Sequence, residues 1–257
     1  MNSKITRHIT MAFALIMACL SLGIQAQTSK RPSNSAASEK LGAARLCTSV
    51  AGKLSTGKIG ILLDRNTPNF QTPRLIDLNG DGVKESVTLS DGSNLSIIRG
   101  DDSFVPDVAD TSGYDDQVFW GEAQSLVQYD KSVFALTSGG KLPALFRFGS
   151  DLKLRLECVF RQIDSRFKAL TPYELFIARS EAQGIDPVTL AIQHQDIGAL
   201  RLLKNNGHDL NRKPNSDHGS YLNDAIFAVS STPAGEAFIA AMLDMGANPP
   251  PPALQSP

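Results

Sequence analysis

The stretch DPVTLAIQHQDIGALRLLKNNGHDLN, residues Asp186 to Asn211, decides the organisation of the C-terminal part of the chain. Asp186 can cap a helix, and Pro187 suits the first helical position, where a backbone N–H would have no helical partner. Apolar residues then recur at helical spacing in two runs, and Gly207 stands where a left-handed helix end is expected. The stretch therefore predicts two short amphipathic helices joined by a turn.

These residues resemble an ankyrin repeat. The segment Leu190–Ile192 matches the first helix of that family, and Asn206–Asn211 matches the turn after its second helix. A weaker copy extends from Asn223 to Asn248, and Ala191 lies 34 residues before Ala225, close to the ankyrin period of about 33. The resemblance implies two stacked hairpins. An ordinary pair of helical hairpins with no binding role is the alternative.

The longer spacing of 39 residues between Gly207 and Gly246 predicts an insertion in the second copy, at residues 230–235. In the ankyrin family, the turns and first helices form a concave surface that binds other proteins. The resemblance therefore implies a protein partner of unknown identity, which would contact His194, His208, Asp209 and Asn211.

The N-terminal residues carry an export pattern. Lys4 and Arg7 precede an apolar run, and Ala26 can stand before a cleavage point, which is typical of a signal peptide over residues 1–26. A lipid anchor on Cys19 is a second interpretation, because the residues before it loosely resemble a lipobox. We expect residues 27–44, rich in Ser, Asn, Ala and Lys, to be a disordered leader.

Charge argues against one class of partner. The 257 residues carry 25 basic and 26 acidic side chains, a net charge of −1. Removal of residues 1–26 deletes Lys4 and Arg7 and no acidic residue, which changes the net charge from −1 to −3. A chain without a basic surplus is not expected to bind nucleic acid. No later run is long and apolar enough to predict a transmembrane span, so we expect a periplasmic or secreted protein.

Two cysteines remain after the predicted signal peptide, Cys47 and Cys158. An exported chain meets an oxidising compartment, where an even number of cysteines suggests pairing. We therefore expect a Cys47–Cys158 disulfide that brackets an N-terminal domain. Two buried free thiols are the alternative.

The remaining segments predict an α+β fold class, an antiparallel β domain followed by a small ankyrin-like helical-repeat domain. Apolar and polar residues alternate over residues 45–162, with turn residues between the runs, which predicts about six to eight strands. Residues 171–248 are expected to be helical, with a capping box at Thr171. We expect residues 163–170 to be a linker and residues 249–257, with four consecutive prolines, to be an extended tail.

The stretch DLNGDGVKE, residues Asp77 to Glu85, places oxygen-bearing side chains at alternate positions. Calcium takes six to eight oxygen ligands, and Gly82 permits the sharp turn that directs them inward. The pattern predicts a Ca2+ site formed by Asp77, Asn79, Asp81, the carbonyl of Val83 and Glu85. A plain Asn-Gly-Asp-Gly turn with solvated carboxylates is the alternative.

The flanks of this loop differ from those of an EF-hand. Thr88 stands where that motif needs a bidentate Glu, and the segments around it are β-rich, with Asp91-Gly92 as a hairpin signal. Strand, loop and hairpin resemble the FG-GAP or VCBS calcium loop of extracellular β-propellers, over about 25 residues. The resemblance implies a bound calcium ion, although one copy does not make a propeller.

Few residues suggest catalysis. The three histidines beyond the predicted signal peptide have no partner at metal-ligand spacing, and no G-x-S-x-G motif occurs. We therefore expect an exported, non-enzymatic protein-binding protein, for example an inhibitor or immunity protein. The alternatives are a metal-dependent periplasmic hydrolase that uses residues 77–85 and an envelope-tethered structural protein.

Overall fold

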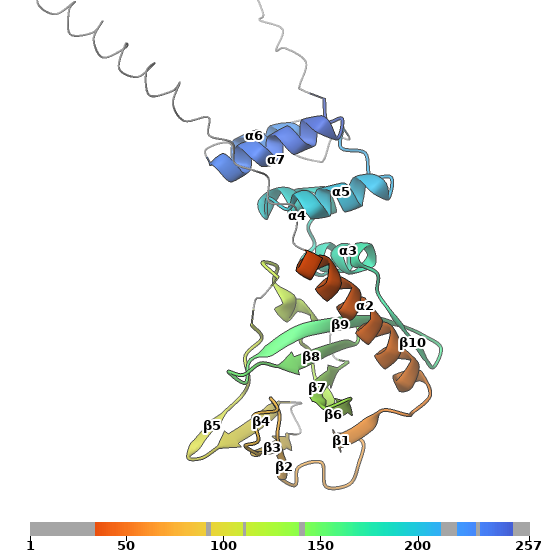
Figure 1. The fold of residues 1–257 in the computed structure, drawn as a ribbon, viewed down its shortest axis with the longest axis vertical. Coiled ribbons are helices and arrows are strands. Elements are labelled where there is room, and N and C mark those ends of the chain that lie inside the picture. Colours follow the sequence, from red (N-terminus) through yellow and green to blue (C-terminus); the bar gives the residue numbers. More distant parts are fainter. Residues whose placement is uncertain are drawn as a thin grey trace, which may run out of the picture. The chain divides into compact units, whose positions relative to one another are not determined.

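The computed structural model describes residues 34–90, 94–109, 112–138, 142–211, 220–229 and 232–248 (Figure 1). It contains antiparallel sheets and helices, which confirms the expected α+β fold class. The predicted signal peptide, Cys19 and the predicted tail 249–257 lie outside the described residues. Within the described residues, no helix combines the length and the apolar character needed to cross a bilayer.

Helix α2 extends from Asn34 to Ser55, so the expectation of a disordered leader up to residue 44 is wrong from Asn34 onward. Its sequence is rich in Ala, Leu, Lys and Arg, which favour helix, and its later turns carry an apolar face that packs on the β sheet. A disulfide joins Cys47 to Cys158 with the two Cα atoms 5.5 Å apart. The predicted cysteine pairing is therefore present, and it connects α2 to strand β9.

A six-stranded antiparallel sheet has helix α2 packed on one face. Its strand order is β1-β6-β7-β8-β9-β10. Successive residues of its strands point to opposite faces, so Phe134 and Leu145 pack with α2 while Ala135 and Phe146 pack toward the second sheet. The bounds are β1 Gly60–Asp64, β6 Ala123–Tyr129, β7 Ser132–Thr137, β8 Ala144–Phe148, β9 Leu154–Ile163 and β10 Arg166–Ala169.

The second sheet has four antiparallel strands in the order β2-β3-β4-β5. Their bounds are β2 Arg74–Ile76, β3 Glu85–Leu89, β4 Leu95–Arg99 and β5 Asp102–Phe104. Alternate residues such as Val87 and Ile97 are buried against the larger sheet. Leu89 pairs with Leu95, which confirms the predicted hairpin, although its turn at residues 91–93 lies outside the described residues.

Nine strands begin within the described part of residues 45–162, more than the six to eight expected there. The expected linker 163–170 is wrong, because β9 continues to Ile163 and β10 pairs back on it. The physical reason is burial: Phe167 of β10 packs edge-on against Phe160 of β9, with ring centroids 6.0 Å apart, at the edge of the α2 core.

Helix α3 (Pro172–Gln183) begins with the predicted capping box. The Thr171 hydroxyl accepts a hydrogen bond from the N–H of Glu174 at 3.2 Å, and Glu174 Oε2 accepts one from the N–H of Thr171 at 2.8 Å. Ala178 of this helix packs into the core of the sheets, whereas Phe176 packs with the helices that follow. Residues 43–257 accordingly form one compact unit.

Two helical hairpins follow, α4 (Pro187–Gln193) with α5 (Ile197–Asn205) and α6 (Tyr221–Val229) with α7 (Pro233–Asp244). Helix α4 packs on α6, and α5 packs on α7. Both hairpins end in a left-handed turn, since Gly207 has a φ of 87° and Gly246 a φ of 89°.

The expected insertion at residues 230–235 is wrong. Three residues separate the two helices in each hairpin. The extra length of the second hairpin lies in its helices, which have nine and twelve residues against seven and nine in the first.

Candidate functional site

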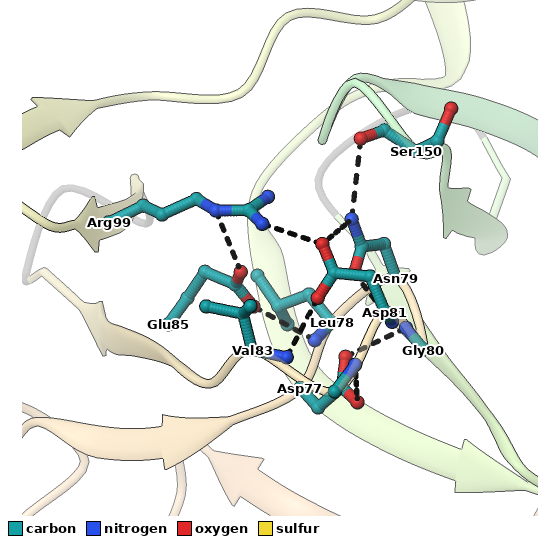
Figure 2. A network of polar contacts seen from close by, with 10 residues as sticks. Asp77, Leu78, Asn79, Gly80, Asp81, Val83, Glu85, Arg99 and Ser150 are labelled. Atoms are coloured by element: carbon teal, nitrogen blue, oxygen red, sulfur yellow. Dashed lines mark hydrogen bonds and ion pairs between the residues drawn. The ribbon is translucent and has the colours of Figure 1, made fainter.

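The acidic loop, residues Asp77–Glu85, connects β2 to β3 in the four-stranded sheet (Figure 2). Gly80 and Gly82 have positive φ angles of 77° and 85°, so the backbone turns sharply at these positions. Asn79 Nδ2 donates a hydrogen bond to the carbonyl of Ser150 at 3.3 Å. This bond ties the loop to the turn between β8 and β9.

Two of the loop carboxylates accept hydrogen bonds from the loop backbone. Both oxygens of Asp77 accept N–H groups, from Gly80 at 2.8 Å and from Gly82 at 3.0 Å. Asp81 Oδ1 accepts the N–H of Val83 at 2.8 Å. Short side chains that bond the backbone of their own turn hold the turn in one shape.

Glu85 is fully buried, and Arg99 lies beside it. Glu85 Oε2 accepts the N–H of Leu78 at 3.1 Å, whereas Oε1 accepts no hydrogen bond from the described residues and lies 3.7 Å from Nε of Arg99. Arg99 Nη2 donates to Asp81 Oδ2 at 2.6 Å. Figure 2 shows the guanidinium between the two carboxylates, at the end of the β3–β4 ladder.

The electrostatics of the loop follow from these contacts. The backbone hydrogen bond from Val83 lowers the pKa of Asp81, and Arg99 lowers it further. The pKa of Arg99 is raised by its hydrogen bond to Asp81 and then by the charges of Asp81, Glu85 and Asp77. Arg99 is therefore the cationic partner of two of the carboxylates, Asp81 and Glu85. No sequence motif marks Arg99 as a site residue, although the register of the β3–β4 hairpin places it opposite Glu85.

The loop has oxygen ligands of the kind that calcium prefers, and a cation of the chain itself contacts two of the expected ligand residues. Carboxylate and amide oxygens are ligands that calcium prefers, and the five expected ligand residues do lie in one loop. The guanidinium of Arg99, however, stands against Asp81 and Glu85. In the described part of the chain, no group of three or more His, Cys, Asp or Glu is placed to hold a metal ion. A calcium ion at these carboxylates would therefore stand beside the positive charge of Arg99.

Asn211, one of the residues expected to contact a partner, connects the two hairpins. Its Nδ2 donates to the carbonyl of Gly246 at 2.9 Å, and its Oδ1 accepts the N–H of Asn248 at 2.6 Å. Asp209 Oδ1 accepts the N–H of Asn211 at 2.9 Å. These contacts hold the turn of the first hairpin to the turn of the second.

The two histidines within the described residues lie against tyrosines. His208 Nε2 is 2.9 Å from the hydroxyl of Tyr173 in α3. His194 is exposed, and its ring centroid is 4.5 Å from that of Tyr114. The hydroxyl of Tyr114 donates to Asp196 Oδ2 at 2.7 Å.

Tyr114 belongs to a polar cluster with Asp116, Arg179 and Asp196 that no sequence motif predicts. Burial, and then the hydrogen bond to Asp196, raise the pKa of Tyr114, so its hydroxyl stays protonated. Arg179 of α3 lies over its ring at 4.9 Å and donates twice to Oδ1 of the buried Asp116, at 2.9 and 2.6 Å. Beside it, an open cavity of about 410 Å³ lies between residues 112–114 and 194–197. These residues carry no motif and are far apart in the sequence.

Comparisons of the chain with protein-family models, with curated proteins and with solved structures found no match. The class of protein is therefore defined by its α+β fold, the disulfide-bonded sheet unit and the two stacked hairpins. Function has to be inferred from the exposed surfaces and from the charges of these parts.

Proposed function

We propose that this chain is an exported, non-enzymatic protein that binds another protein through its second helical hairpin. The observation that carries the proposal is a group of exposed apolar side chains on this hairpin, Ile226 and Phe227 of α6 and Leu243 of α7. These side chains are 39%, 73% and 45% exposed. Clustered exposed apolar residues mark interaction sites more often than single ones do.

Two apolar positions of the second hairpin, Ile226 and Ile239, correspond to positions that the first hairpin uses for packing, whereas Phe227 and Leu243 align with the exposed Gln193 and Lys204. The 34-residue period aligns Ile192 with Ile226, and the two turn glycines align Leu200 with Ile239. Ile192 and Leu200 are 2% and 0% exposed in the core that the hairpins share. Ile226 is exposed, and Ile239 is half-buried at the edge of that core. Hairpins in stacked arrays bury such positions against a neighbour, so the exposed apolar group suits a helical partner.

Charge indicates the kind of partner. Two acidic side chains of α7, Glu236 and Asp244, are exposed, and the sequence from Tyr221 to Asn248 has no Lys, Arg or His. Electrostatic complementarity raises association rates and disfavours wrong partners. We therefore infer a partner with an apolar patch bordered by Lys or Arg. An inhibitor or immunity protein that covers a basic toxin or hydrolase is the specific form we favour.

Two features support export. The Cys47–Cys158 disulfide is of the kind that persists in oxidising compartments. The first 26 residues have the pattern of a signal peptide. We propose a periplasmic or secreted location on these grounds. The stacked hairpins with matching glycine turns also support our proposal that this part is ankyrin-like.

Affinity capture with designed variants tests the binding proposal. The mature chain from Gln27 would capture proteins from the organism that encodes it, with identification by mass spectrometry. The test variant is Phe227→Ser combined with Ile226→Ser. Leu75→Ser is the matched control, because Leu75 is 70% exposed but lies on strand β2 of the small sheet.

We expect one stoichiometric partner that the wild type and Leu75→Ser recover equally and that the double variant loses. Circular dichroism would confirm that the double variant is folded. A partner retained by the double variant but lost with Asp209→Lys would move the binding surface to the hairpin turns. Equal recovery by all variants would contradict binding through the helical hairpins.

A further inference from the structure

The acidic loop is in contact with a cation of the chain itself, Arg99 at the end of strand β4. Arg99 Nη2 is 2.6 Å from Asp81 Oδ2, and Arg99 Nε is 3.7 Å from Glu85 Oε1 (Figure 2). An independent observation comes from Glu85. Its side chain is 0% exposed, and Oε1, which points to Arg99, accepts no hydrogen bond from the described residues. A buried carboxylate oxygen without a hydrogen bond needs a nearby positive charge.

We propose that the guanidinium of Arg99 takes the place of a metal ion in the acidic loop, so that the loop reaches its folded shape without calcium. Arginine is always charged, and its planar fork matches carboxylate oxygens. Arg99 already bonds Oδ2 of Asp81 and lies against Oε1 of Glu85, two of the expected calcium ligands. A calcium ion on these carboxylates would be repelled by the guanidinium, so the two cations exclude each other.

Two consequences follow from this exclusion. The wild-type chain should have the same melting temperature, Tm, with calcium and with a chelator. Removal of the guanidinium should leave buried Glu85 without a positive partner, which is costly. It should also leave Asp77, Asp81 and Glu85 as oxygen ligands with no competing cation, so a calcium ion can then neutralise them.

The experiment is thermal unfolding of the disulfide-bonded chain from Gln27, in millimolar calcium or in chelator at equal ionic strength. The variants are Arg99→Gln and, as a matched control, Arg155→Gln. Arg155 also pairs with an aspartate, Asp151, at 2.9 Å, and its side chain has the same 34% exposure as that of Arg99. The control pair involves no buried carboxylate.

We expect the Tm of the wild type to be independent of calcium. In chelator, Arg99→Gln should lower Tm by roughly 5–10 °C, and the control by less than about 3 °C. Calcium should restore about half of the loss in Arg99→Gln and none in Arg155→Gln. Calorimetric titration should detect calcium binding to Arg99→Gln alone.

Three outcomes would overturn the proposal. A wild-type Tm that rises by several degrees with calcium would show that the metal displaces Arg99, and this measurement needs no variant. A loss in Arg99→Gln no larger than in Arg155→Gln would show that Glu85 does not depend on Arg99. A destabilised Arg99→Gln that calcium does not rescue would show that the guanidinium does not stand in for a metal. None of these outcomes bears on partner binding by α6 and α7.

Discussion

At the scale of single residues, the buried ion pair Asp116–Arg179 joins the short 3-10 helix Asp116–Phe119 to helix α3. The side chains are 2% and 12% exposed, and Arg179 also covers the ring of Tyr114. Ser112 donates to the second oxygen of Asp116 at 2.7 Å, so this buried carboxylate is fully partnered. Breaking one side of a buried pair is costly because the other charge stays buried.

We predict that Arg179→Met destabilises the chain by about 3–5 kcal/mol. Arg155→Met, which breaks an exposed pair, should cost at most about 1 kcal/mol. Urea unfolding followed by circular dichroism measures both. Adding Asp116→Asn to Arg179→Met should recover part of the loss, since the buried charge is then removed. Equal stability of the two single variants would contradict a buried ion pair at this position.

The contacts of Asp81 predict that its contribution to stability depends on pH. Its pKa is lowered in the folded chain by the N–H of Val83 and then by Arg99. A carboxylate of this kind stabilises the fold fully above its ordinary pKa of about 3.9, and the contribution is lost as the pH falls through the lowered value. The Tm difference between wild type and Asp81→Asn should therefore be largest near neutral pH and should shrink below about pH 4. A difference that does not change with pH would contradict this account.

At the scale of elements, the helical hairpins are stabilised both by local caps and by hydrogen bonds between residues far apart in the sequence. Asp186 caps α4 by accepting the N–H groups of Val188 and Thr189, as the sequence predicted. The turns that follow α5 and α7 are then joined by Asn211. The side chain of Asn211 thus adds two hydrogen bonds to the apolar packing between the hairpins.

We predict that Asn211→Ala costs about 1–3 kcal/mol, because the change removes two hydrogen bonds to the backbone of the second hairpin. Asn206→Ala is the control, since the side-chain amide of Asn206 donates to the carbonyl of Leu202 in its own helix and to no other described residue. It should cost less than about 1 kcal/mol. Hydrogen exchange should show faster opening of α6 and α7 in Asn211→Ala alone. Unchanged exchange there would mean that apolar packing suffices to hold the stack.

At the scale of the whole molecule, the disulfide closes the longest constrained loop in the chain that the structure describes. The two cysteines are 111 residues apart, and the bridge holds α2 on the six-stranded sheet. Chain-entropy models give about 4–5 kcal/mol for a loop of this size. We predict that Cys47→Ala with Cys158→Ala lowers stability by up to that amount, as measured by urea unfolding. A reducing agent should lower the wild type equally and leave the double variant unchanged.

Much of the fold could be predicted because it rests on local chemistry. The capping box at Thr171, the cap at Asp186 and the left-handed turn at Gly207 each depend on residues within one turn. The β3–β4 hairpin followed from alternation and a turn dipeptide. The disulfide followed from the count of cysteines after the predicted signal peptide. The caps, the turn and the hairpin depend on residues that are close in the sequence. The disulfide could be predicted because two cysteines allow only one pairing.

Other features depended on the tertiary structure. Helix α2 has only a modest local signal, and its apolar face is stabilised by packing on the six-stranded sheet. Strand β10 looked like a polar linker because only Phe167 is apolar enough to mark it, and its pairing with β9 decides its structure. The periodicity of a sequence indicates which residues form an apolar face, but it does not indicate which distant part of the chain packs on that face.

The candidate site divides in the same way. The sequence by itself determined the acidic loop, its glycines and the three carboxylates, since these lie within nine residues. Only the tertiary structure brought Arg99 between Asp81 and Glu85, and only it turned Asn211 from an expected contact residue into a bridge between hairpins. Strand register and helix stacking set these distances. Register and stacking depend in turn on the burial of whole apolar faces, and not on the local sequence around Arg99 or Asn211.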